Sequence, residues 1–415
     1  MNRDEGGAQA QITADAVARR SYGKLVAFLA TRTGDVASAE DALSEAFASA
    51  LADWPRNGCP QNPEAWLMTV ARRKFLDAAR GRRREIASDE FEETAEAIEA
   101  GANETEIPDR RLGLMFACAH PAIDAAIRAP LMLQAVLGLD AARIASAFLI
   151  SPATMGQRLV RAKNKIRQAG IPLRIPAREE LRGRLDTVLD AVYAAFAEGW
   201  SDAAGTDVAR RDLAEEAIFL CRVVTDLLPL EPEGLGLLAL MLHAEARRPA
   251  RRNAEGDYVP LAEQDPAAWN SEMIEEAETL LRRASALGSM GRYQLEGAIQ
   301  SAHVARRLTG RSNWAAVVQL YDALLVISGS PVAALNRALA IAELNGAAAA
   351  LDAIDSAAAD ARLADYQPYW AARAELLART GAHQQACHAY DIAIGLERDP
   401  SVRRFLEQRR ASLAR

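Results

Sequence analysis

The sequence predicts an all-helical protein built from two or three domains. The chain has 415 residues, half of them apolar, which is enough to bury a sizeable core. Alanine, leucine, arginine and glutamate dominate, and long runs of β-branched residues are scarce, so the composition favours helices over strands. The net charge of −7 argues against a protein that coats nucleic acid indiscriminately. Any surface that binds nucleic acid must therefore be local and balanced by acidic surface elsewhere.

The cysteines and the N-terminus indicate the cellular setting. Cys59, Cys118, Cys221 and Cys387 lie far apart and form no CxxC pair, so we expect reduced thiols. The N-terminus lacks the basic-then-apolar pattern of a secretion signal, and no segment is long and apolar enough to span a bilayer. These features predict a cytoplasmic protein without a membrane partner.

The first helical unit is expected at residues 10–85, and it opens with "SAEDALSEAFASALADWP" at 38–55. This segment predicts an amphipathic helix that Trp54 and Pro55 bring to an end. Its polar side is expected to hold Glu40, Asp41, Ser44 and Glu45. Its apolar side is expected to hold Ala42, Leu43, Ala46, Phe47, Ala50 and Leu51.

A second helix of this unit is predicted by "NPEAWLMTVARRKFLDAARGRRR" at 62–84, with Asn62 as N-cap and Pro63 at the first position. Its expected buried stripe consists of Leu67, Val70, Ala71, Phe75 and Ala78. Trp66 has two readings, because an aromatic on a helix is commonly core but can also stack on an unpaired base. Residues 86–109 follow with many carboxylates and no Lys or Arg, which predicts an acidic, flexible linker.

The second unit, at residues 110–172, ends in two short helices. Asp140 is the expected cap of the first, and Ile144, Ala145 and Phe148 supply its inner face. Ser151 and Pro152 then start "SPATMGQRLVRAKNKIR", whose inner seam is expected to be Met155, Leu159, Ala162 and Ile166. Two short helices with a tight turn and a basic outer face predict a helix-turn-helix. The plainer alternative is a solvated basic surface helix.

The remaining part, residues 181–415, follows a join at 170–180 that carries two prolines. Four helices are expected at 186–198, 213–227, 235–246 and 271–286. A helix pair is expected at 314–346 with its turn at 329–331, and another over 380–400, where small and aromatic residues let helices pack closely. Such repeats bury a face by stacking and leave a concave surface for partners.

Residues that suggest chemistry have plainer explanations. His383, Cys387 and His388 form an HxxxCH cluster, but no second ligand pair follows at metal spacing, so a packed helix is the better reading. Asp352 and Asp355 are expected to be solvated rather than catalytic. No GxSxG, P-loop or GxGxxG pattern occurs in the right context. We therefore expect no enzyme activity, no metal and no cofactor.

These motifs, in this order, resemble a bacterial RNA polymerase sigma factor of the extracytoplasmic-function (ECF) type. "AEDALSEAFASALADWP" is similar to region 2.2, "AWLMTVARRKFLDAARGRR" to regions 2.3 and 2.4, and "DAARIASAFLISPATMGQRLVRAKNKIR" to region 4.2. "CAHPAI" at 118–123 and the large C-terminal part are similar to a subgroup with a tetratricopeptide-like (TPR-like) extension. The resemblance implies core RNA polymerase and promoter DNA as partners, and the extension implies a further protein partner.

The resemblance also implies site residues. Region 4.2 would meet the −35 element through Thr154, Gln157, Arg158, Arg161, Lys163, Lys165 and Arg167. Gln157, Arg158 and Arg161 suit base edges, and the later cations suit phosphates. Region 2 would meet the −10 element through Trp66, Arg72, Arg73, Lys74, Asp77 and Arg80. The core polymerase would meet Asp41, Glu45 and Phe47.

Two other functions are compatible with parts of this pattern. A free-standing helix-turn-helix regulator with a TPR-like sensor would bind duplex DNA as a dimer. A pure repeat scaffold would carry its basic helices as incidental surface. Neither alternative needs the segment that resembles region 2.

Overall fold

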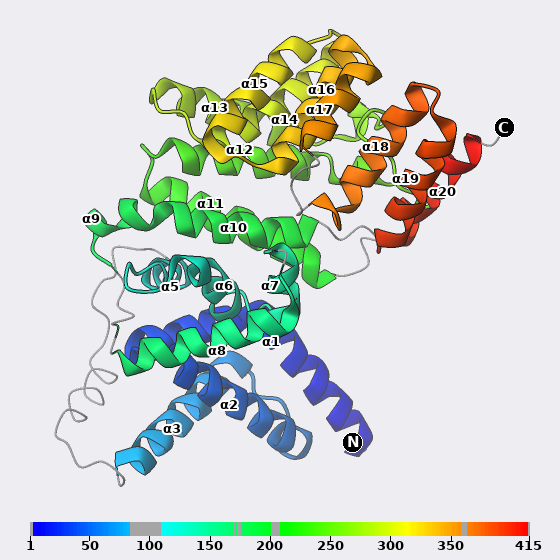
Figure 1. Ribbon diagram of the computed structural model, residues 1–415. Coiled ribbons are helices and arrows are strands. Elements are labelled where there is room, and N and C mark those ends of the chain that lie inside the picture. The colour runs from blue at the N-terminus through cyan, green and yellow to red at the C-terminus, as the bar shows by residue number, and fades with distance from the viewer. Residues whose placement is uncertain are drawn as a thin grey trace. The chain divides into compact units, whose positions relative to one another are not determined.

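The computed structural model describes residues 3–83, 109–148, 150–169, 171, 176–200, 208–357 and 363–413. Within these ranges the regular structure is helical, apart from one isolated antiparallel bridge between Arg252 and Tyr258 (Figure 1). The predicted all-α fold class is confirmed. The predicted acidic linker lies outside the described residues, except for Asp109.

The chain divides into two compact units. One comprises Met1–Gly199 and Asp212–Val223, and the other comprises Trp200–Arg211 and Val224–Arg415. The boundaries at 211/212 and 223/224 therefore both fall inside helix α11 (Val208–Leu227). The domain limits predicted from sequence, at 10–85, 110–172 and 181–415, remain predictions.

The first unit begins with three helices, α1 (Arg3–Thr33), α2 (Val36–Asn57) and α3 (Pro63–Arg83). Asp35 caps α2, because its carboxylate accepts from the amides of Ala37 and Ser38 at 3.0 and 3.2 Å. The prediction that α2 ends at Trp54 and Pro55 is wrong. Pro55 costs α2 one hydrogen bond in its last turn only, and the helix continues to Gly58, whose positive φ of 85° ends it.

The predicted buried faces of α2 and α3 are mostly observed. Asn62 accepts from the amide of Ala65 at 3.0 Å, which confirms it as the cap of α3. Leu51 is wrongly placed in the α2 core: it is 48% exposed, because Ala50 and Trp54 form the buried row one position away. Ala78 is also exposed. Among the described residues of α3, the buried row ends at Phe75.

Among the described residues, the same unit continues with four helices before the join. They are α5 (Arg110–Cys118), α6 (Ala125–Ala135), α7 (Ala141–Ala147) and α8 (Pro152–Gln168). Asp140 accepts from the amides of Ala142 and Arg143, both at 2.9 Å, so it caps α7 as predicted. Ser151 likewise caps α8 by accepting from the amide of Thr154 at 3.2 Å.

Three further elements close the first unit. They are α9 (Arg178–Leu181), the 3-10 turn η1 (Arg182–Arg184) and α10 (Leu185–Trp200), followed by the middle part of α11, Asp212–Val223. Arg184 is buried and donates to the carbonyl oxygen of Phe116 in α5 at 3.0 Å. Arg111 of α5 is buried too, and its guanidinium pairs with Asp109 and with Glu216 of α11. The helices after the join therefore pack on α5.

In the described residues, the second unit consists of successive helices and includes the 3-10 turns η2 (Arg248–Arg251) and η3 (Pro266–Ala268). Its complete helices are α12 (Pro232–Ala246), α13 (Ser271–Ala286), α14 (Arg292–Thr309), α15 (Trp314–Ser328), α16 (Pro331–Asn345), α17 (Ala347–Ala357), α18 (Gln367–Arg379), α19 (His383–Leu396) and α20 (Pro400–Ser412). Each of these helices packs against the next one along the chain (Figure 1).

The helix pair predicted at 314–346 is observed as α15 and α16. The pair predicted over 380–400 is wrong in its bounds, because this range holds one complete helix, α19, which pairs with α18 before it. Gly329 has a positive φ of 55° and Ser330 caps α16, so α15 and α16 turn where the sequence places the turn. In the last pair, Ala386, Tyr390 and Ala393 are buried in one core with Leu377 of α18. At Gly236 a side chain would lie 2.5 Å from the amide nitrogen of Gln294, so glycine is what lets α12 and α14 touch.

Candidate polymerase and nucleic-acid interface

The outer face of α8 is solvent-exposed and cationic. Met155, Leu159 and Ile166 are buried on its inner face, as the seam predicts, and Ala162 is half-buried. The exposed side chains include Thr154, Gln157, Arg158, Arg161, Lys165 and Arg167, all of them predicted to meet the −35 element. Arg167 also donates to Asn164 at 2.8 Å. Their contact with DNA remains a prediction.

Lys163 differs from the other cations of α8. Its side chain is only 15% exposed and forms an ion pair with Glu40 of α2, which is 16% exposed. The predicted phosphate contact of Lys163 is therefore unavailable while this pair is intact. Burial raises the pKa of Glu40, and the nearby ammonium of Lys163 opposes that rise. The thiol of Cys118 lies close to the pair, and burial raises its pKa to about 12.

On α3, the residues predicted to meet the −10 element vary in exposure. Arg73 and Asp77 are exposed, Arg72 and Lys74 are half-buried, and the side chain of Arg80 lies outside the described structure. Lys74 pairs with Glu45 of α2 at 3.6 Å in an exposed position. Such pairs contribute little to stability, so both partners remain available for other contacts.

Trp66 is partly packed in the core, and its predicted role in stacking on a base remains a prediction. Its ring meets the buried ring of Trp54 edge to face, with 5.5 Å between centroids and an angle of 65°. The rest of the Trp66 side chain is half-buried rather than sealed in the core. One face is therefore fixed by packing, and the accessible part can still meet a base.

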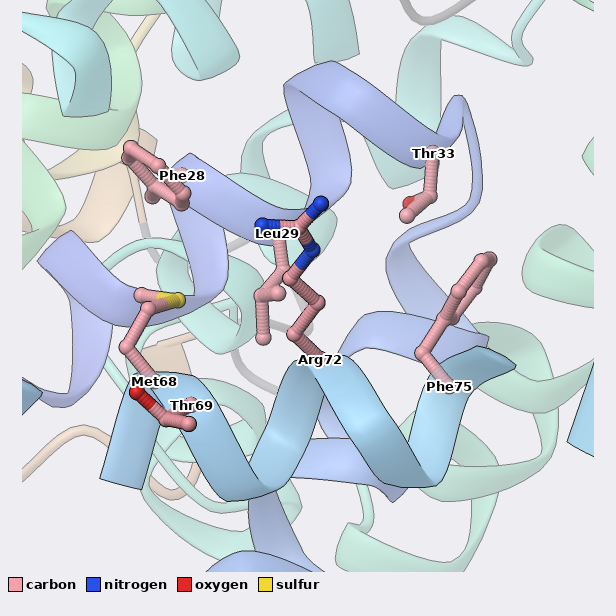
Figure 2. Close-up of a pocket in the computed structure, with 7 residues that line it drawn as sticks. All are labelled: Phe28, Leu29, Thr33, Met68, Thr69, Arg72 and Phe75. Carbon is pink, nitrogen blue, oxygen red and sulfur yellow. The ribbon is translucent and has the colours of Figure 1, made fainter. Parts of the chain in front are cut away.

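A hollow of about 190 Å³ lies between α1 and α3. Its lining consists of Phe28, Leu29, Thr33, Met68, Thr69, Arg72 and Phe75. Figure 2 shows Arg72 reaching from α3 towards Leu29 on α1, with Met68 and Phe28 on one side and Phe75 and Thr33 on the other. A mostly apolar hollow with a guanidinium and two hydroxyls suits a flat heterocycle. Of the lining residues, only Arg72 belongs to the predicted −10 set; no pattern in the sequence marks the others as site residues.

The residues predicted to bind core polymerase lie on α2. Asp41 and Glu45 are exposed. Phe47 is half-buried and stacks on Tyr22 of α1, with 6.5 Å between the ring centroids. Phe47 therefore supports the packing of α1 on α2, and only its outer part is open to a partner.

The residues considered for metal binding do not form a site in the described parts of the chain. No group of three or more His, Cys, Asp or Glu side chains there could hold a metal ion. His383 approaches the carbonyl oxygen of Leu413 at 3.5 Å, and Asp355 pairs with Arg373. None of the described helices is long and apolar enough to cross a membrane.

Comparison with known proteins agrees with the N-terminal geometry. Residues 17–85 match Sigma-70 region 2, and residues 184–285 match a family of unknown function (DUF6596). Uncharacterized protein R00370 of Rhizobium meliloti (strain 1021) is 36% identical over 385 residues, which cover 91% of this chain and 90% of the relative. No solved structure matches the chain.

The region 2 match supports a sigma factor, because this type of domain binds core RNA polymerase and promoter DNA. The chain belongs to the same family as the Rhizobium meliloti protein, and its first 85 residues carry the region 2 of a sigma-70 factor.

Proposed function

We propose that this chain is an alternative sigma factor of the ECF type, a dissociable subunit that directs core RNA polymerase to promoters. One observation carries the proposal: a segment that matches Sigma-70 region 2 at 17–85 is followed by two short capped helices, α7 and α8, and α8 exposes a row of cations. Neither a free-standing regulator nor a repeat scaffold needs both features on one chain. In this proposal the polymerase makes the bonds, and the chain positions it.

Each helix then has a separate task. The exposed carboxylates Asp41 and Glu45 on α2 meet the polymerase. Arg72, Arg73 and Trp66 on α3 meet the −10 element, and the hollow beside Arg72 accepts an unpaired base. On α8, Arg158 reads a guanine edge and Gln157 an adenine edge in the −35 element, while Lys165 and Arg167 hold phosphates.

The C-terminal helices are proposed to form a TPR-like array that regulates initiation through a protein partner. Successive helix pairs with small residues at their contacts, such as Ala386 and Ala393, support this assignment. An array of this kind presents repeated inner helix faces, and these faces suit an extended peptide or a helix of a partner.

Transcription with purified components tests the function. Full-length protein and core polymerase are combined on genomic fragments, and run-off transcripts are mapped. We expect discrete start sites that need both proteins, and only weak binding of the isolated chain to duplex DNA. Tight, sequence-specific duplex binding by a dimer without polymerase would instead establish the helix-turn-helix regulator.

A further inference from the structure

Two arginines at the end of α12 and in η2, within the second unit, have no carboxylate partner. Arg247 is only 9% exposed, and it donates to the carbonyl oxygen of His243 at 3.1 Å and to the side chain of Gln300 on α14. Arg251 is half-buried and donates to the carbonyl oxygen of Trp200 at 2.7 Å. Among the described residues, neither guanidinium forms an ion pair with a carboxylate.

Helix α14 adds His303 and Arg306 to the same place. Burial, followed by the charges of Arg306 and Arg247, lowers the pKa of His303 to about 4. Burial, followed by the charge of Arg251, lowers the pKa of Arg247 to about 10. The four side chains are therefore close enough to affect one another electrostatically. We call Arg247, Arg251, His303 and Arg306 the basic cluster.

Two tryptophan rings hold the half-buried arginines of this cluster in place. The guanidinium carbon of Arg251 lies 4.2 Å from the ring centroid of Trp200, and that of Arg306 lies 3.8 Å from the ring centroid of Trp314. A guanidinium that stacks on a ring keeps its orientation and can use its N–H edge for an oxyanion. Nη1 of Arg306 and Nδ1 of His303 are buried and have no hydrogen-bond partner in the described structure. The cluster therefore has fixed polar groups with unused hydrogen-bonding capacity.

A structural role explains only part of this arrangement. Arg247 stabilises the last turn of α12, because its Nε donates to a carbonyl oxygen there. Two carboxylates near the basic cluster, Asp399 and Glu343, already pair with Arg252 and Arg379 at 2.8 and 2.7 Å. Buried cations without a counterion reduce stability, and buried polar atoms without partners do so as well. A bound anion would correct both deficits.

Burial and charge together indicate the kind of anion. A duplex backbone meets protruding cations, such as Arg158 and Arg161 of α8, which are exposed. The basic cluster is buried or half-buried, which suits a small ligand instead. A phosphate group carries nearly two negative charges and three acceptor oxygens at one centre. It therefore matches several arginines that converge on one place better than a single carboxylate does.

We propose that the basic cluster binds the phosphate group of a small phosphorylated molecule. Arg251 and Arg306 hold the phosphate oxygens with their N–H edges, and Arg247 adds positive charge from a more buried position. The site goes beyond the proposed sigma function and does not depend on it. Because Arg247 and Arg251 lie within 184–285, the site also gives the segment that matches DUF6596 a ligand to bind.

Binding can be measured on the full-length chain by calorimetric titration with pyrophosphate as the probe. Citrate, a polycarboxylate of comparable charge, is titrated in parallel. We expect saturable binding of pyrophosphate and binding of citrate that is at least 10-fold weaker, because the arginines converge on one phosphate group and not on separate carboxylates. Titration at a fixed ionic strength keeps the screening of all other surface charges equal.

A matched pair of arginine variants locates the binding. Arg251→Met should weaken pyrophosphate binding by about 10-fold or more, because it removes charged hydrogen bonds to the phosphate. Arg251→Lys keeps the charge but not the planar fork, so most of that loss should remain. Arg337→Met removes an arginine of the same unit whose charge is already balanced by Asp322, so the affinity should stay unchanged.

A second measurement uses the unaltered chain, so it does not depend on the folding of any variant. Phenylglyoxal modifies accessible guanidinium groups, and mass spectrometry of the peptides follows the rate at each arginine. Pyrophosphate should slow the modification of Arg251 and Arg306 and leave the rate at Arg337 unchanged. If circular dichroism shows that Arg251→Met is misfolded, this protection decides the question.

The possible results separate this site from the proposed function. Equal loss of affinity in Arg251→Met and Arg337→Met, or equal protection of all arginines, would overturn the site, because binding would then follow overall charge. Citrate binding as tight as that of pyrophosphate would overturn the phosphate as the recognised group. Failure of the unaltered chain to bind core polymerase would reject the sigma function, and the titration and the protection would still report the site.

Discussion

Helix α2 carries two ion pairs, five residues apart, that differ in their surroundings. Glu40 pairs with Lys163 in a contact where both side chains are about 15% exposed, at 16% and 15%. Glu45 pairs with Lys74 of the neighbouring helix α3, and these side chains are 63% and 42% exposed. The first pair joins segments far apart in sequence, and the second lies on the surface of one helical bundle. Removing one partner should therefore reduce stability more at the first pair. At the second pair, water can solvate the charge that remains.

The largest effect is expected from removing Lys163. Lys163→Met leaves Glu40 buried without its counterion, so the free energy of local opening around α8 should fall by about 2–3 kcal/mol. Hydrogen exchange of α8 peptides, followed by mass spectrometry, measures this change in the full-length chain. Unchanged exchange in α8 would show that the buried pair does not hold the helix in place.

A comparable or smaller effect is expected from a substitution on the exposed side of α8. Arg158→Ala should weaken promoter binding of the polymerase complex by about 1–3 kcal/mol and relax the preference at one promoter position. Binding to a set of promoters with single-base changes measures both. Equal weakening on every promoter would exclude Arg158 from base reading.

Lys165 provides the matched control for Arg158, because it is exposed on the same helix and predicted to meet a phosphate. Lys165→Ala should weaken all promoters about equally and reduce the slope of log affinity against log salt concentration by about 1. Titrations at several salt concentrations give that slope. A change confined to one base position would instead place Lys165 in the groove.

The smallest effect is expected at the exposed pair of α2. Lys74→Met should change the free energy of local opening around α3 by less than about 1 kcal/mol, because solvent already screens both charges. Hydrogen exchange of α3 peptides measures this change, and the result is compared with that of Lys163→Met. Equal effects of the two substitutions would remove the distinction between the buried and the exposed pair.

Local features of the fold follow from the sequence, and contacts between distant segments do not. The caps Asn62, Asp140 and Ser151 each act within three residues, so a short stretch predicts them. The turn at Gly329 is local in the same way. Pro55 is the exception. A proline in the last turn does not end a helix, but the nearby sequence does not show that Pro55 lies in the last turn of α2.

In the candidate site, too, local features can be predicted from the sequence, and contacts between distant segments cannot. The exposed cations of α8 follow from helical periodicity, because the seam from Met155 to Ile166 fixes which face is inward. Periodicity puts Lys163 and Glu40 beside the buried rows of their helices, and Lys165 and Glu45 away from them, but it does not show that Lys163 and Glu40 become partners. Lys163 and Glu40 are largely buried because α8 packs beside α2. The sequence signal that could have drawn attention to this packing is Gly23, a glycine inside a long helix.

The pairing of Arg111 with Glu216 has a consequence for how such a chain can be inherited. Arg111 is only 6% exposed, and one of its two carboxylates comes from α11, beyond residue 184 where the match to DUF6596 begins. A gene rearrangement that cut the extension away near Pro176 would leave this guanidinium with Asp109 alone. Such a fragment would have to acquire a compensating substitution before it could persist. The parts of the chain before and after the join are therefore not interchangeable modules, and their coding sequences are expected to stay together.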